Sequence, residues 1–278
     1  MTGLPPAAID NHCHVLDGSR TGVRGARYPI FDAPLPAYMQ HLAALGAGRG
    51  VLVTASAHGS DNEPLLDALA HSDRELRGVA VVNTDATDDE LLRLHSYGVR
   101  ALRLQDRFPG GAPLASLGTM ARRAANLGWH LEIWTAWTDH LDWLPRAVAA
   151  SPVPVVVDHL GYFPPGHHDE AAAIDTLVGL ARDGQAWITL SGAARVTEEE
   201  PAEAGHRVAP RVRRLLAEVP DRLLWGSDWP HVAAPIRPPT ARELLDELDV
   251  WFEGDEDLLE QVTVANGEIA YGFEPRAT

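Results

Sequence analysis

The feature that most constrains the fold is an alternation of short apolar segments with stretches of helical spacing, repeated eight times. The apolar, often β-branched segments are predicted strands, whereas leucines such as Leu91 and Leu94 recur at helical spacing between them. Strand–helix alternation indicates parallel strands, because a crossover helix returns the chain to the same edge of the sheet. The predicted strands are Ala8–Val15, Gly50–Ser56, Arg77–Asn83, Arg100–Gln105, Trp129–Thr135, Val153–Asp158, Ala186–Ser191 and Leu223–Gly226.

Eight such units in 278 residues predict a closed (β/α)8 TIM-type barrel, an α/β fold, with residues 1–278 forming a single domain. Five or six units would have suited an open doubly wound sheet better. No Gly-x-Gly-x-x-Gly turn follows the first strand, which weakens a dinucleotide-binding alternative. Thr240 and Glu243 have capping-box spacing and predict the start of the eighth helix. We expect the extension beyond it, Leu258 to Tyr271, to pack on the outside of the barrel.

Composition excludes several classes of partner and chemistry. The formal charge of −16 predicts no nucleic-acid partner and no binding to anionic membranes. The chain has no lysine, so Schiff-base lysines and carbamylated-lysine metal bridges are excluded. Cys13 is the only cysteine, which excludes an intrachain disulfide and cysteine-rich zinc sites. No secretory signal or membrane-length apolar run is visible, so we expect a cytoplasmic location.

The strongest local signal is the pair His12 and His14 at the end of the first strand. Alternate residues of a strand face the same way, so both imidazoles are predicted to project into the barrel mouth while Cys13 faces the helices. Two imidazoles held in this way can ligate a divalent metal, or they can surround one substrate oxygen with hydrogen bonds. The alternative is a pair of structural core histidines.

Two further strand ends carry groups of the same kind. Asp228 follows the eighth strand between Trp225 and Trp229, where a carboxylate can act as general base toward water. Asp158 and His159 follow the sixth strand, and His159 is predicted to face the site because it has the parity of Val155 and Val157. Polar groups at strand ends are expected of a barrel enzyme, because reacting groups lie at that rim.

Arginines at the same rim predict an anionic small-molecule substrate. Arg103 lies at the end of the fourth predicted strand and Arg195 follows the seventh, and a guanidinium matches a carboxylate in a bidentate way. A structural ion pair is the competing interpretation for each of them. The remaining predicted contacts with substrate are Tyr28, Trp134 and His231.

Three ordered motifs carry a family resemblance: Asp10–Val15, Val157–Gly161 and Trp225–His231. Together they resemble the amidohydrolase superfamily (amidohydrolase-2 type), and within it the lactonases typified by 2-pyrone-4,6-dicarboxylate lactonase. The resemblance implies a hydrolase that opens a carboxylated lactone, pyrone-like, muconolactone-like or a sugar-acid lactone. It makes Asp228 the base that activates water, has His12, His14 and His159 polarise the lactone carbonyl, and gives Arg103, Arg195 and Tyr28 to the substrate.

The resemblance also implies that no metal is required, although a single zinc or manganese ion on His12, His14, His159 and Asp228 stays open. The chain departs from the pyrone dicarboxylate pattern at Tyr162, where an arginine is usual, and at Trp134, where a tyrosine is usual. Fewer anion clamps favour a related lactone with one carboxylate or sulfonate. The rival activity is a metal-dependent decarboxylase of the aminocarboxymuconate-semialdehyde type, and whether the enzyme is a homo-oligomer is left open.

Overall fold

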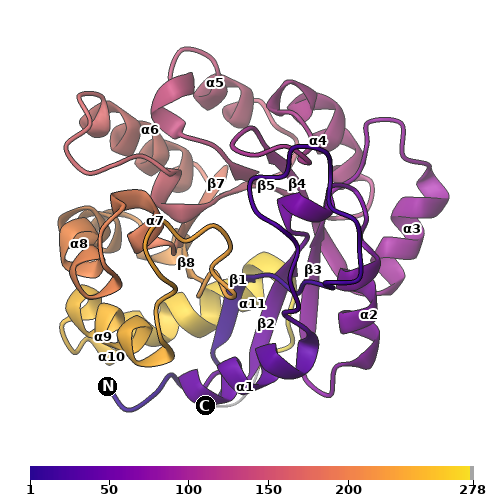
Figure 1. Ribbon diagram of the computed structural model, residues 1–278. Coiled ribbons are helices and arrows are strands. Elements are labelled where there is room, and N and C mark those ends of the chain that lie inside the picture. The colour runs from indigo at the N-terminus through magenta and orange to yellow at the C-terminus, as the bar shows by residue number, and fades with distance from the viewer. Residues whose placement is uncertain (276–278) are drawn as a thin grey trace.

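The computed structural model describes residues 1–275, which form one parallel sheet rolled into a barrel with helices around it (Figure 1). The strand order follows the sequence from β1 to β8, and every neighbouring pair is parallel, as predicted for a (β/α)8 fold. The strands are β1 (Ile9–Cys13), β2 (Arg49–Val53), β3 (Leu76–Ala80), β4 (Val99–Gln105), β5 (His130–Trp134), β6 (Val155–Val157), β7 (Ala186–Leu190) and β8 (Leu223–Trp225).

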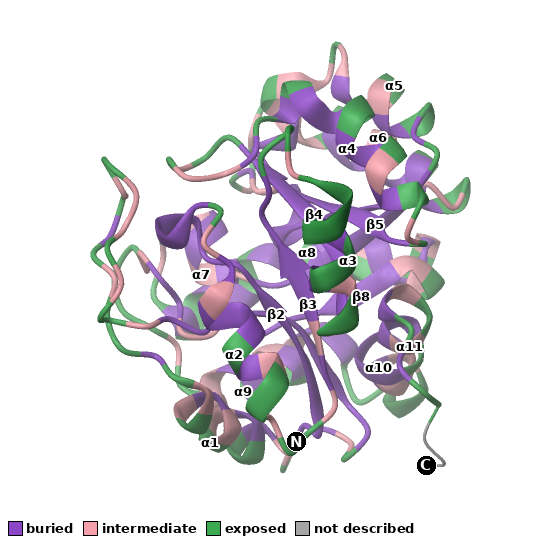
Figure 2. Ribbon diagram, turned by 90° about the vertical axis from the view of Figure 1, so that its right-hand side faces the viewer, coloured by how far each residue is buried: buried purple, intermediate pink, exposed green. Residues whose placement is uncertain are grey.

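The helices lie outside the sheet and bury their apolar faces against it, while their outer faces are exposed (Figure 2). They are α1 (Leu35–Leu45), α2 (Glu63–His71), α3 (Asp88–Ser96), α4 (Leu117–Ala125), α5 (Leu144–Ala149), α6 (Glu170–Arg182), α7 (Ala193–Thr197), α8 (Pro201–Glu218), α9 (Ala241–Phe252), α10 (Glu256–Glu260) and α11 (Asn266–Tyr271). The predicted capping box is confirmed, because Thr240 and Glu243 exchange side-chain and backbone hydrogen bonds at the start of α9. Most strands end earlier than predicted, since their polar C-terminal residues belong to the mouth loops.

Strand β1 contains an irregularity that sets the direction of the site histidines. Asp10 pairs with Gly50 and Cys13 with Leu52, so three residue steps on β1 oppose two on β2. Such a bulge re-aims the side chains beyond it. Cys13 consequently joins the core on the helix side, as predicted, while His12 faces the barrel interior.

The barrel closes between β1 and β8 through side chains as well as backbone. Asn11 Nδ2 donates to the Trp225 carbonyl at 3.0 Å, and Cys13 forms an isolated parallel bridge with Trp229. The Asp10 carboxylate accepts hydrogen bonds from Ser227 N at 2.7 Å and from Ser227 Oγ at 2.6 Å. The residue before Asp228 is therefore fixed to the strand that carries His12.

The expectation that Leu258 to Tyr271 packs on the outside holds for Leu259, Val262 and Val264, which join the core on the helix side, but it is wrong at the end of the segment. Helix α11 and the residues after it do not simply cover the outside, because Tyr271 and Phe273 pack with inward-facing strand residues such as Ile9 and Val156. The Tyr271 hydroxyl lies 3.5 Å from Glu132 Oε2 inside the barrel. These two rings close the end opposite the mouth, which a simple amphipathic pattern does not reveal. Within residues 1–275, no helix is long and apolar enough to cross a membrane.

Candidate active site at the mouth of the barrel

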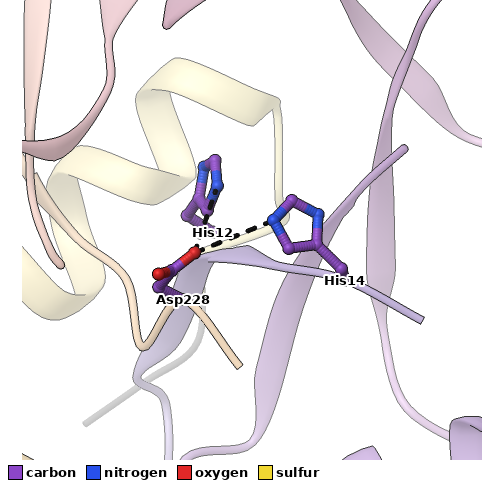
Figure 3. A group of neighbouring side chains, drawn as sticks. All are labelled: His12, His14 and Asp228. Atoms are coloured by element: carbon purple, nitrogen blue, oxygen red, sulfur yellow. Dashed lines mark ion pairs between the residues drawn. The ribbon is translucent and has the colours of Figure 1, made fainter. Parts of the chain in front are cut away.

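Three imidazoles from two strand ends converge on one carboxylate oxygen at the mouth. The Nε2 atoms of His12, His14 and His159 lie 4.0, 3.7 and 4.0 Å from Oδ1 of Asp228. Figure 3 shows His12 and His14 directed toward Asp228 from neighbouring positions on the same chain segment. All four side chains are buried. The residues predicted to form the catalytic group therefore lie together, although they are more than 200 residues apart along the chain at the extremes.

Each imidazole has a different neighbour at its other ring nitrogen: a hydrogen-bond partner for His14 and His159, and a carboxylate for His12. His14 Nδ1 lies 2.8 Å from the Val53 carbonyl oxygen, which can only accept, so Nδ1 carries the proton and Nε2 has a free lone pair. His159 Nδ1 lies 2.8 Å from Ser191 Oγ, a hydroxyl that can donate or accept. His12 Nδ1 lies 3.4 Å from Asp158 Oδ1. The three rings thus differ in what their Nε2 atoms can do.

Burial and neighbouring charges separate the proton affinities of these rings. Burial lowers the pKa of His14 to about 4 and that of His159 to about 3. Burial also lowers the pKa of His12, but the carboxylates of Asp158 and Glu132 outweigh it, so the net shift is upward. At neutral pH, His14 and His159 are neutral, and His12 is the ring most ready to be protonated.

Asp228 is held ionised by an arginine. Arg195 Nε and Nη2 donate to Oδ2 of Asp228 at 3.1 and 2.7 Å, and Nη2 also donates to the Val232 carbonyl at 2.7 Å. Burial alone would raise the pKa of Asp228, but Arg195 and the surrounding histidines bring it well below its usual range. One oxygen of the carboxylate is therefore used by Arg195, and the other faces the imidazoles.

The loop conformations explain how the side chains reach the mouth. Val156 packs inside the barrel and Val155 and Val157 pack on the helix side, so strand parity would send His159 toward the helices. The prediction that His159 faces the site was right, but its reason was wrong. His159 has a φ of 51° and Asp228 a φ of 61°, and these left-handed turns bring both side chains back over the barrel.

A buried charge network lies behind His12, and part of it escaped sequence analysis. Arg103 Nη2 donates to Asp158 Oδ2 at 3.0 Å, and Arg103 Nε lies 3.4 Å from Glu132 Oε1. Burial and the nearby Asp158 carboxylate raise the pKa of Glu132. The available signal for Glu132 was a single acid between the apolar residues Leu131 and Ile133 of a strand. Arg103, predicted to bind substrate, is thus engaged in a structural ion pair.

The other predicted substrate contacts are Trp134 at the end of β5, Tyr28 in the loop after β1 and His231 in the loop after β8. The Trp134 ring meets His159 at 5.9 Å and Tyr162 at 5.3 Å, centroid to centroid, and forms a wall of the mouth. The hydroxyl of Tyr28 lies 3.2 Å from Oγ of Ser56, in the loop after β2. His231 backs the Asp228 loop, and its backbone N donates to the Asp228 carbonyl at 2.7 Å.

A cleft of about 380 Å³ opens beside this group between the loops that follow β4 to β7. It reaches Arg195 at the Asp228 end and Arg107 on its wall, whose guanidinium lies 5.2 Å from the Tyr162 ring centroid and 3.3 Å from Asp139 Oδ2. The side chain of Arg107 is 33% exposed, in contrast to 2% for Arg103. The other polar residues that line the cleft include Thr138, Asp139, His167, Thr197 and Glu198.

The same group of residues also has the composition of a metal site. His12, His14 and Asp228 offer ligand atoms within 4.8 Å of one another, and so do His12, Asp158 and His159. His12 Nε2 is buried and has no hydrogen-bond partner among residues 1–275. Two ligands at about 2.0–2.1 Å from a zinc ion lie on the order of 3–4 Å apart. The donor set around Asp228 Oδ1 therefore fits one divalent ion.

Comparisons with known proteins identify one matching family and several similar proteins. The model of the family described as Amidohydrolase matches residues 9–273. The chain is 36% identical over 247 residues to 2-pyrone-4,6-dicarboxylate hydrolase of Comamonas testosteroni, covering 82% of this chain and 78% of that one. It is 31% identical over 276 residues to 4-sulfomuconolactone hydrolase of Rhizobium radiobacter, covering 97% and 91%.

Among solved structures, the chain resembles one from Acinetobacter baumannii described as a 2-pyrone-4,6-dicarboxylic acid hydrolase with citric acid bound. The TM-score is 0.83 at 26% identity, with 96% of this chain and all of that chain covered. The resemblance therefore extends through the whole barrel as well as the motifs at its mouth.

Proposed function

Because the chain belongs to the amidohydrolase family, we propose that it is a hydrolase that opens a carboxylated lactone with water. The observation that carries the proposal is the convergence of three Nε2 atoms on Oδ1 of Asp228 beside an arginine-lined cleft. The relatives from Comamonas testosteroni and Rhizobium radiobacter are named for hydrolysis of 2-pyrone-4,6-dicarboxylate and 4-sulfomuconolactone. Both compounds are cyclic esters that carry acidic groups.

The charges in the cleft favour a substrate with one anionic group. Arg107 and Arg195 supply positive charge, and Asp139 and Glu198 supply negative charge on the same walls. A dicarboxylate would bring a second anion close to these acids, whereas a monocarboxylate, a sulfonate or a sugar-acid lactone would not. We assign anion binding to Arg107 and Arg195, and we assign to Arg103 the orientation of Asp158 behind His12.

Asp228 is the proposed base toward water. A water molecule between Asp228 Oδ1 and His14 Nε2 can donate one hydrogen to each, because both atoms are acceptors, and its oxygen is then free to attack. Arg195 links this base to the substrate. If the substrate anion draws the guanidinium away from Asp228 Oδ2, the carboxylate loses the partner that lowers its pKa and becomes a stronger base.

The other two imidazoles are the proposed donors to the carbonyl oxygen. Ser191 Oγ can donate to His159 Nδ1, which leaves the proton on Nε2. His12, beside Asp158 and Glu132, is the ring most easily protonated and can donate from Nε2 as well. Donors placed where negative charge develops on the oxygen stabilise the tetrahedral intermediate.

A single divalent ion is compatible with the same residues. His12, His14, His159 and Asp228 would hold it, and it would polarise the carbonyl and increase the acidity of bound water. The family resemblance implies a metal-free reaction. Whether activity depends on a metal therefore distinguishes a site in which Asp228 and the imidazoles act alone from one in which they hold a divalent ion.

The test is hydrolysis of a panel of lactones by protein purified without chelator, before and after chelator treatment, with metal analysis of the same sample. We expect turnover of a monoanionic lactone and a loss of about 10²–10⁴ in kcat for Asp228→Asn. The exposed Asp85 after β3 provides the matched control, because Asp85→Asn should leave kcat unchanged. Full activity in Asp228→Asn would show that the base is misassigned.

The same donor set supports one rival, a mononuclear metal-dependent decarboxylase. Stoichiometric zinc required for activity, together with carbon dioxide release and no hydrolysis of any lactone, would replace the proposed reaction with the rival. Chelator-insensitive hydrolysis would exclude it.

A further inference from the structure

A second cavity is lined by Asp228 and shares Arg195 with the lining of the substrate cleft. It is lined by the start of α7, by Ser227, Asp228 and His231, and by α9 residues that include Glu247. Its volume is about 30 Å³. One water needs about 10–15 Å³ on this measure, so the cavity has room for about two water molecules. The cavity thus gives Asp228 a space of water size that is separate from the cleft assigned to the substrate.

Glu247 separates this cavity from the outside of the protein. The same residue lines a groove of about 170 Å³ between α8 and α9, together with His206 and Val250. Its carboxylate forms no hydrogen bond or ion pair within the described part of the chain, residues 1–275. A partly buried carboxylate without a partner costs stability, so packing alone does not account for an acid at this position.

Helix α8 makes room for this side chain with a glycine. A Cβ at Gly205 would lie 2.9 Å from Glu247 Cγ. A glycine inside a helix is destabilising relative to alanine. Trp251 Nε1, one turn after Glu247 on α9, donates to the Gly205 carbonyl at 3.0 Å and holds the two helices at this spacing. The glycine therefore allows the carboxylate to lie between the two cavities.

The cations near Glu247 are engaged elsewhere. Arg195 is paired with Asp228, and Arg237 is paired with Glu243 and Glu200. Burial accordingly raises the pKa of Glu247 to about 8, so the carboxyl can take up and release a proton near neutral pH. The titratable and charged groups around the two cavities are Arg195, Asp228, His231, Arg237 and Glu243 on the inner side, and His206, Glu243 and Asp246 on the outer side.

We propose that Glu247 and the two cavities form an exit route for the proton that the reaction produces. The proposal rests on the proposed lactone hydrolysis. In that reaction water adds to the ester carbon and the ring C–O bond breaks. Asp228 takes one water hydrogen as the new C–O bond forms, and protonated His12 gives its proton to the ring oxygen as the ring C–O bond breaks. His12 regains a proton from the new carboxylic acid as that acid ionises, so lactone and water give a hydroxycarboxylate and one proton, which is left on Asp228. The proton left on Asp228 passes through cavity water to Glu247 and then to water in the groove.

The route makes Glu247 a positioning and relay residue that never touches substrate. We expect Glu247→Gln to lower kcat by about tenfold at neutral pH with KM unchanged, less than the loss expected for the base itself. The solvent deuterium isotope effect on kcat should rise, because proton departure becomes limiting. Glu247→Asp should restore part of the rate. Glu203→Gln, the same change at an exposed position of α8, is the matched control and should alter nothing.

A readout independent of turnover separates this proposal from the proposed function. Infrared difference spectra between pH 6 and pH 9 should contain protonated-carboxyl bands from Glu132, whose pKa is also raised, and from Glu247. The band of Glu247 is the one that Glu247→Gln removes and Glu203→Gln retains. Thermal unfolding should confirm that each variant is folded. If wild-type protein hydrolyses a lactone and Glu247→Gln matches it in kcat and isotope effect, or if the band persists in that variant, the route is wrong and the proposed function stands. Wild-type protein that hydrolyses no lactone overturns both.

Discussion

The ion pair between Arg195 and Asp228 gives the most direct test of how the site is organised before substrate binds. The two side chains are only 7% and 4% exposed, and Arg195 donates twice to the same carboxylate oxygen. Removing one partner of such a pair leaves an uncompensated buried charge and costs about 3–5 kcal/mol. We therefore expect Arg195→Leu to lower the free energy of unfolding by that amount, and Tm by on the order of 10 °C.

A double-mutant cycle isolates the pair from the other contacts of each side chain. Asp228→Asn removes the charge from the partner, so the double variant should be more stable than the sum of the two single changes predicts. We expect a coupling free energy of about 2–3 kcal/mol, measured by urea-induced unfolding followed by tryptophan fluorescence. The exposed pair Arg93 and Glu63 serves as the control, because surface ion pairs couple by no more than about 1 kcal/mol.

The pH dependence of the free energy of unfolding in the same variants tests the direction of the Asp228 pKa shift. The pKa of Asp228 is well below its usual range in the folded protein, so the pair contributes stability above the pKa of the unfolded chain and loses it as pH falls through the folded value. The stability advantage of wild type over Asp228→Asn should therefore shrink in acid. A coupling free energy below about 0.5 kcal/mol would refute the pairing, and with it the idea that a substrate anion strengthens the base by drawing Arg195 away.

Two further predictions concern substrate binding and the barrel seam. Arg107→Met should raise KM for an anionic lactone by about 10- to 100-fold with a smaller change in kcat, because the partly exposed guanidinium binds the anion without touching the reacting carbon; an unchanged KM would contradict this. Burial raises the pKa of Asp10 to about 6, so the folded protein holds its proton longer than the unfolded chain and loses stability as pH rises from about 4 to about 6. Asp10→Asn should therefore gain about 3 kcal/mol relative to wild type over that range in urea unfolding, whereas a pH-independent difference would be evidence against it.

Much of the fold could be predicted because it depends on local patterns. Eight apolar segments, each with its helix, led to the eight parallel strands that the structure contains. The Thr240 capping box was readable for the same reason, since all its atoms lie within four residues. The C-terminal extension was misplaced because its apolar residues fit either the helix side or the barrel interior. Only the closed barrel shows that Tyr271 and Phe273 fill one open end.

Sequence analysis predicted which catalytic candidates lie close together, but it did not predict which charged side chains pair with one another. Strand-end positions brought His12, His14, His159 and Asp228 together without any knowledge of distance, because all parallel strands end at one rim. Strand parity failed at His159, where a left-handed turn rather than the strand sets the direction of the ring. Glu132 was missed because its partners are on other strands.

The arginines show why pairing is the harder inference. A chain of charge −16 has more acids than arginines, so an arginine near the mouth can satisfy its charge inside the protein as easily as on a substrate. Sequence analysis assigned substrate binding to Arg103, which lies four residues before Arg107. In the fold, Arg103 is surrounded by two buried acids, while Arg107 meets one exposed acid at the edge of a cleft. A guanidinium that is already buried and paired has to leave its partner before it can bind an anion. Arg107 is therefore the better first contact for substrate, and Arg103 is better suited to set the proton affinity of the two carboxylates it holds.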